Sequence, residues 1–327
     1  MACITGVALC ALLLLPKEYP LLTETSLASA QFVDPHLRRF NLVALDTLSH
    51  GKTEGDVPEV YGQVEAACDV AAFMDAVKLP ACIIVGMSLG SVIGLQLALL
   101  YPKKVAGLYL VSPLGTEEPE DIQDGRREIY DTWRESFVDG NIDKDTLVHC
   151  LSGGIELAFS GHATNMVRTL IRIAVPEAVK HWGPGHFEDC AKTTVNIFTD
   201  HQSYDPQTLA RLSSVPLALV HCSDDIAFTR DYMGVFTSQL SASGVGFDVH
   251  EVPGAPHFGS ITHSHLINPL LARFVANHWN GPQLLEIEAS SVFKSPFEDG
   301  MRQVGWRDSG EDSGEESDDN RSFLLPS

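Results

Sequence analysis

The chain has 327 residues, a hydrophobic content of 44% and a formal net charge of −21. This length and hydrophobic content suit one large α/β domain that carries an insertion better than several small domains. The negative charge excludes the class of nucleic-acid-binding proteins, because these need a positive face toward the phosphates, and it also disfavours an anionic membrane surface. We therefore expect a single globular unit with neither nucleic acid nor membrane as its partner.

The chain starts with a short apolar run, residues 2–15. The run resembles the core of a signal peptide, but no Lys or Arg precedes it, and it is too short to span a bilayer. A buried strand fits this run better. The seven cysteines show no CxxC pair and no ligand spacing, which is typical of free thiols in a reducing compartment and not of a metal site. We expect a cytoplasmic protein, with secretion as the alternative if residues 1–15 act as a signal.

Apolar runs of strand length then alternate with helical stretches, a pattern typical of an α/β fold with a mostly parallel sheet and helices on both faces. The expected strands are residues 12–15, 40–46, 81–87, 105–112, 216–222 and 247–252. The expected helices between and after them are residues 63–77, 89–100 and 265–278.

The strand pattern disappears over residues 114–214, which have the pattern of helices, for example over 120–138 and 164–181. Such a stretch inside an α/β chain predicts an inserted helical cap. The core is then expected over residues 11–113 and 215–280.

The composition turns polar beyond residue 281. From Asp308 to Asp319 there are seven acids and no base. A segment with this much charge and so few apolar side chains cannot bury enough apolar surface to offset the conformational entropy lost on ordering. We expect residues 281–327 to be an acidic disordered tail, removable from about Ser295 onward without loss of stability.

A G-x-S-x-G pattern stands at Gly86-Met87-Ser88-Leu89-Gly90. Its glycines let the chain turn sharply from a strand into a helix, so that the serine side chain stands clear at the carboxyl edge of a sheet. Here the pattern follows an apolar strand and precedes a long apolar helix, as that geometry requires. Ser88 is therefore the candidate nucleophile.

A serine nucleophile needs a base that accepts its proton and an acid that orients the base. Asp224 and Asp225 directly follow the strand expected at 216–222. The loop after the last strand supplies His257, framed by Pro and Gly, whereas His263 and His265 border the final helix. The candidate base is His257, and the acid is one of the two aspartates.

These segments together resemble the α/β-hydrolase superfamily over residues 11–279, and among its members the cap-bearing hydrolases of fungi. The segments that carry the resemblance are FNLVALDTLSHGKT at 40–53, where the family shows a D-x-R-G-H-G-x-S turn, then GMSLGS, VHCSDD and GAPHF. The resemblance implies a Ser-His-Asp triad of Ser88, His257 and Asp225, with Asp224 as the alternative acid. It implies no cofactor.

The chain departs from the family pattern at two places. Leu48 and Ser49 stand where the family has Arg and Gly. The His-Gly motif of the oxyanion loop is also missing, because the family's His-Gly-x-Pro aligns with Lys17-Glu18-Tyr19-Pro20. The oxyanion hole is expected to use the backbone N–H of Leu89 and, from this loop, that of Tyr19.

The resemblance implies a serine hydrolase that acts on a small-molecule substrate, an ester, lactone or similar apolar acyl compound. The atypical start of the chain favours an alternative, a non-catalytic ligand receptor or scaffold. The inserted segment carries aromatic side chains that would line an apolar acyl pocket or, for most of them, the core of the cap: Trp133, Phe137, Phe159, Trp182 and Phe187.

Overall fold

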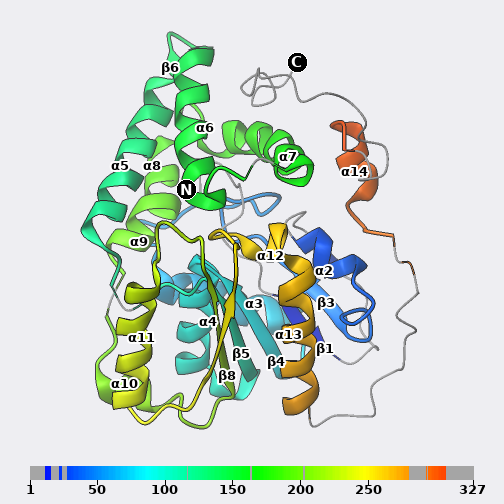
Figure 1. Cartoon of the computed structure of the whole chain (residues 1–327). Helices are drawn as coiled ribbons and strands as arrows, with labels where there is room; N and C mark the ends of the chain where they lie inside the picture. The colour runs from blue at the N-terminus through cyan, green and yellow to red at the C-terminus, as the bar shows by residue number, and fades with distance from the viewer. Residues whose placement is uncertain are drawn as a thin grey trace.

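The computed structural model of the chain describes residues 12–15, 22–23, 28–115, 117–162, 164–201, 203–279, 292 and 294–306, the first two ranges as backbone only. A seven-stranded sheet organises this part of the chain (Figure 1). Its strands are β1 (Leu12–Leu15), β2 (Leu22–Thr23), β3 (Asn41–Ala44), β4 (Cys82–Met87), β5 (Val105–Val111), β8 (Leu217–Cys222) and β9 (Asp248–Val252). Every strand expected from the apolar runs is present, whereas the very short β2 was not expected.

The strand order is β2-β3-β1-β4-β5-β8-β9, and the sheet is mostly parallel, as predicted. The exception is β1, which lies between β3 and β4 and runs antiparallel to both. Leu12 pairs with Val85 near the end of β4, whereas Leu15 pairs with Asn41 at the start of β3. The carboxyl end of β1 therefore lies at the edge of the sheet opposite to the carboxyl ends of β4, β8 and β9.

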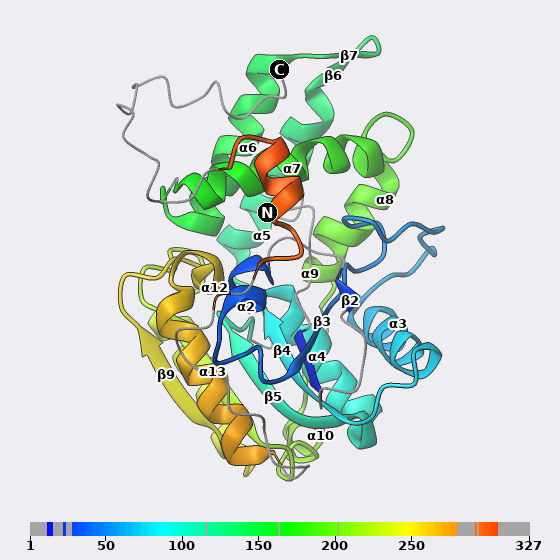
Figure 2. The same cartoon turned by 90° about the vertical axis from the view of Figure 1, so that its right-hand side faces the viewer.

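Helices cover both faces of the sheet (Figures 1 and 2). On one face lie α3 (Gln63–Ala76), α4 (Leu89–Leu100) and α11 (Arg230–Ala242), and on the other lie α2 (Ser29–Val33) and α13 (Ser264–His278). Successive strand residues supply opposite faces: Ile84 packs with the first group of helices and Ile83 with the second. The remaining elements of the core are short: η2 (Pro102–Lys104), α10 (Pro206–Ala210) and α12 (Gly259–Thr262).

Between β5 and β8 the chain forms a group of helices, called the cap below, above the carboxyl edge of the sheet (Figure 1). Its elements are α5 (Glu120–Glu135), β6 (Phe137–Val138), β7 (Asn141–Ile142), α6 (Lys144–Phe159), α7 (Asn165–Trp182), α8 (Phe187–Ala191), the π-helix η3 (Lys192–Asn196) and α9 (Ile197–Thr199). The hairpin β6–β7 differs from the expected all-helical insertion.

Most of the cap's aromatic side chains pack within the cap. Trp133 and Trp182 are fully buried, and the indole N–H of Trp133 donates to the carbonyl of Trp182 at 2.8 Å. The Phe137 ring lies 5.3 Å from that of Trp133 and 5.8 Å from that of Phe187. Two of the five aromatics also make ring contacts with the core: Phe159 with Phe258, and Trp182 with His50 of the turn after β3.

The segment 294–306 corrects the expectation of a disordered tail from residue 281 onward. It contains the short helix α14 (Glu298–Gln303), which lies against α7 (Figure 2). Met301 is buried, and the Phe297 ring meets the Phe32 ring of α2 edge-on at 5.7 Å. These few apolar side chains supply the contacts that the polar composition of the segment concealed. The acidic run 308–319 lies outside the described residues.

No helix among the described residues is long and apolar enough to cross a membrane. In the same part of the chain, no group of His, Cys, Asp and Glu side chains is arranged to hold a metal ion. The described cysteines are free thiols, namely Cys68, Cys82, Cys150, Cys190 and Cys222, while Cys3 and Cys10 lie outside the described residues.

Candidate active site

Ser88 occupies a sharp turn between β4 and α4, with φ 53° and ψ −120°. This conformation is unfavourable for a residue with a Cβ, so the surrounding structure must hold it. The Ser88 N–H donates to Val111 O at 3.1 Å, and the Ser91 hydroxyl donates to Ser88 O at 2.6 Å. A Cβ at Gly86 would lie 2.6 Å from the carbonyl carbon of Gly90, so only glycine fits there. The turn thus has the geometry that G-x-S-x-G predicts.

Asp225 and His257 form a buried pair at the same edge of the sheet. His257 Nδ1 lies 2.6 Å from Asp225 Oδ2, and both side chains are at most 1% exposed. The other carboxylate oxygen accepts the N–H groups of Ala227 at 3.1 Å and Phe228 at 2.9 Å. Because Nδ1–H donates to the carboxylate, Nε2 keeps its lone pair. Nε2 is buried and has no hydrogen-bond partner among the described residues.

The alternative acid and the alternative bases lie elsewhere. The Asp224 side chain is exposed and accepts a hydrogen bond from the Ser223 hydroxyl at 3.0 Å. His263 and His265 stack on each other with ring centroids 6.0 Å apart, and His265 is exposed. The structure therefore brings together Asp225 and His257, and it leaves Asp224 outside this pair.

Two parts of the arrangement are incomplete. Among the described residues, no hydrogen bond joins Ser88 Oγ to His257 Nε2. Such contacts are often long in enzymes without substrate and tighten on binding.

The second part is the expected oxyanion hole. Leu89 begins α4, so its N–H is one of the helix-start donors that have no partner within the helix. Tyr19, expected to supply the second donor, lies outside the described residues.

The turn after β3 is bound to the cap. Ser49, which replaces a family glycine, has φ 63°, and its hydroxyl accepts the indole N–H of Trp182 at 3.1 Å. His181 Nε2 lies 2.7 Å from Gly51 O. His50 packs edge-on against the Trp182 ring at 4.9 Å, and burial lowers the pKa of its imidazole to about 4. This docking was not expected, because no local pattern links residue 50 to residue 182.

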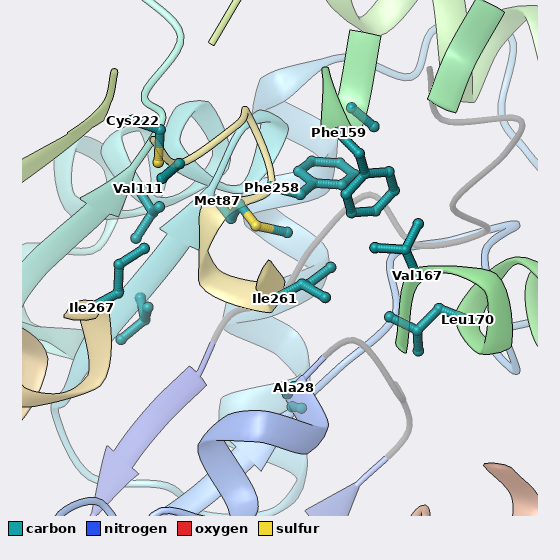
Figure 3. Packing of buried hydrophobic residues seen from close by; sticks show 14 of the residues in the cluster. Ala28, Met87, Val111, Phe159, Val167, Leu170, Cys222, Phe258, Ile261 and Ile267 are labelled. Carbon is teal, nitrogen blue, oxygen red and sulfur yellow. The ribbon is translucent and has the colours of Figure 1, made fainter. Parts of the chain in front are cut away.

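Apolar rings surround the candidate base. The rings of Phe228 and Phe258 lie 5.0 and 5.3 Å from the imidazole of His257. Figure 3 shows Phe159 of α6 against Phe258, with Val167 and Leu170 of α7 on the cap side and Ile261 of α12 on the core side. The sequence indicates Phe159 as a candidate pocket residue, but it does not indicate these partners, because they come from separate elements.

The sequence and the fold both match known proteins. The family model described as "alpha/beta hydrolase fold" matches residues 22–264. The "Putative carbamate hydrolase RutD" of Serratia proteamaculans is 36% identical over 73 residues, 22% of this chain and 27% of that protein. The protein of the same name from Variovorax paradoxus is 35% identical over 100 residues, 29% of this chain and 38% of that protein. The matched regions thus span well under half the length of these curated relatives.

Solved structures show the same fold at low sequence identity. An esterase from Thermogutta terrifontis superimposes with a TM-score of 0.58 and 16% identity, covering 80% of this chain and 87% of that chain. The enol-lactonase from Burkholderia xenovorans LB400 superimposes with a TM-score of 0.57 and 18% identity, covering 79% and 88%. The similarity therefore extends over about four fifths of this chain.

Proposed function

The chain belongs to the α/β hydrolase fold family, and from this premise we propose that it is a serine hydrolase that cleaves an ester, a lactone or a related small apolar acyl compound. One observation supports this most: a buried, carboxylate-oriented imidazole lies at the edge of the sheet where Ser88 occupies its strained turn. Fold alone does not establish an activity, whereas this set of side chains has a defined chemistry.

The proposed reaction starts at Ser88. His257 Nε2 accepts the hydroxyl proton as Ser88 Oγ attacks the carbonyl carbon of the substrate. Asp225 holds the ring in the required tautomer and stabilises the imidazolium that forms. The Leu89 N–H stabilises the negative charge on the carbonyl oxygen. The imidazolium then protonates the leaving group, and water, activated by His257, releases the acyl group from Ser88.

The surroundings support an apolar acyl group. Phe228 and Phe258 flank His257, and the contact between cap and core is formed by the apolar cluster of Figure 3. The solved relatives named as an esterase and a lactonase act, by their names, on acyl compounds, and the carbamate in the RutD name adds a further acyl compound to test.

One observation favours a second candidate, a non-catalytic ligand receptor with the same fold. The family's second oxyanion donor comes from a loop at the edge where the serine lies. Here the described strand before that loop, β1, runs away from this edge, and the described strand after it, β2, lies three strands from β4. Loss of one such donor typically reduces turnover about 10²- to 10³-fold. A hydrolase built in this way is expected to be slow.

The experiment is a screen of p-nitrophenyl esters of graded chain length, with the wild-type protein and Ser88→Ala. We expect slow hydrolysis by the wild type, fastest with a short or medium acyl chain, and only background hydrolysis by the variant, with unchanged thermal unfolding. Equal rates for the two proteins would exclude Ser88 as the nucleophile. No hydrolysis of any ester or carbamate by the wild type would favour the receptor.

A further inference from the structure

The last turn of the cap helix α6 contacts both loops that carry the acid and the base. Ser160 directly follows α6, and its hydroxyl donates to Asp224 O at 2.6 Å. Ala158 O accepts the Phe258 N–H at 2.9 Å, and both of these residues are buried. Asp224 immediately precedes Asp225, and Phe258 immediately follows His257. One end of a cap helix therefore holds the backbone beside each member of the pair.

The acid turn and the base loop are also bonded to each other. The Asp224 N–H donates to Ala255 O at 2.9 Å, and the Gly254 N–H donates to the Ser223 hydroxyl at 2.8 Å. The Asp224 residue thus accepts from the cap through its carbonyl and donates to the base loop through its N–H. Movement of α6 relative to the core would be transmitted to both loops.

Ring contacts continue this connection as far as the imidazole. Phe159 meets Phe258 edge-on at 5.6 Å (Figure 3). Phe258 in turn lies 5.3 Å from the His257 ring. Phe159 and Phe258 are 1% and 4% exposed, so they have little freedom to move separately.

The backbone of Ser160 adds a further observation. Its φ of 47° and ψ of 44° lie in the left-handed region, which glycine enters at lower cost than serine. A glycine would suit the turn but would lack the hydroxyl that reaches Asp224. The contact with Asp224 gives a physical reason for serine at this position.

We propose that Ser160 is a positioning residue, which fixes the acid turn relative to the base loop and so couples the seating of the cap to the geometry of the Asp225–His257 pair. This inference rests on the proposed serine hydrolase function. It assigns the cap an effect on turnover in addition to any effect on substrate binding.

The test compares Ser160→Ala, Ser160→Gly and the control Ser152→Ala in the full chain. Ser152 lies on the same helix, but its hydroxyl donates within the helix, to Val148 O at 2.8 Å. The measurements are kcat and KM with p-nitrophenyl butyrate, the thermal midpoint, and the proton NMR signal of His257 Nδ1–H. Ser160→Gly keeps the turn accessible, so a result is obtained even if the alanine variant does not fold.

We expect both Ser160 variants to lower kcat about fivefold with KM changed less than about twofold, because a small displacement of reacting groups acts on turnover. The Nδ1–H signal should broaden or shift in both, and Ser152→Ala should match the wild type. Unchanged kcat and signal, a rise in KM alone, or an equal loss in Ser152→Ala would each overturn the proposal. The NMR signal needs no turnover, so an inactive wild type would contradict the hydrolase function without obscuring the positioning contact.

Discussion

The site has two sides that are built in different ways. On the β8–β9 side, the contacts that orient the acid join residues close in sequence: Asp225 accepts from an N–H three residues away, and its partner His257 is 32 residues away. On the β3 side, His181 contacts Gly51 across 130 residues, and Ser29 contacts Ser295 across 266. On the first side, local turns orient the acid, and the end of α6 holds these turns in place. The second side depends on the seating of the cap and of α14. Substitutions on the two sides should therefore affect different properties, turnover on the first and stability on the second.

The largest effect is expected on the β8–β9 side. Asp225→Asn removes the carboxylate that fixes the tautomer of His257, and it should lower kcat by about 10³- to 10⁴-fold at unchanged thermal stability. Asp224→Asn is the matched control, since that side chain is exposed and does not contact His257, and it should change kcat less than about threefold. Steady-state kinetics of both variants provide the measurement, and the reverse order would make Asp224 the acid.

On the β3 side, His50 should make stability depend on pH. Burial lowers the pKa of His50 from 6.5 to about 4, so the unfolded chain binds a proton before the folded chain does. The neutral His50 imidazole therefore contributes fully to the free energy of unfolding at neutral pH. This contribution, on the order of 3 kcal/mol, is lost as the pH falls from about 6.5 to about 4. In urea unfolding, the free energy of unfolding of His50→Asn should fall less over this pH range than that of the wild type. The same loss as in the wild type would contradict the expectation, and the exposed His36→Asn is the control.

A smaller effect on stability is expected where α14 connects α7 with α2. Removal of residues 294–327 deletes Phe297 and Met301 and exposes the apolar surface that they cover, including the Phe32 ring, and it should lower the thermal midpoint by about 2–5 °C. Removal of residues 307–327 leaves α14 in place and should change the midpoint by less than about 1 °C. Differential scanning calorimetry provides the measurement. Equal thermal midpoints for the two truncations would show that α14 contributes nothing to thermal stability.

The smallest change is expected at the start of the chain. The double substitution Lys17→His with Glu18→Gly restores the family's oxyanion motif in sequence. However, β1 before these residues runs away from the edge where Ser88 lies, and β2 after them lies three strands from β4. We expect kcat for p-nitrophenyl butyrate to change less than about twofold. A gain of tenfold or more would instead show that this loop reaches the substrate oxygen and that Tyr19 supplies the second donor.

The sequence predicted the parts of the fold that depend on local patterns. The strands β4 and β8 and the helices α4 and α13 lie where apolar runs placed them, and the Ser88 turn follows from two glycines. The family resemblance favoured Asp225 over Asp224, whereas the pattern of residues left both open, because adjacent residues in a turn differ in direction and not in pattern. In the structure it is the Asp225 carboxylate that contacts His257.

The direction of β1 could not be predicted, because the run of four leucines in this strand suits a buried strand of either direction. The same limit applies to α14, whose polar sequence conceals the few side chains that reach the core. It also applies to Ser160, whose contact with Asp224 joins residues 64 apart. Periodicity reports the burial of a residue but not which distant residue it contacts.

Labelling of the wild-type protein with a fluorophosphonate probe, followed by mass spectrometry of the peptides, tests the central claim most directly. Only an activated serine forms the covalent adduct, and labelling requires a single attack and no release of product. We expect one adduct, on the peptide that contains Ser88, and none in Ser88→Ala or after heat unfolding. An adduct on another serine, or no adduct at any time with a folded protein, would contradict the claim that Ser88 is a nucleophile activated by His257 and Asp225.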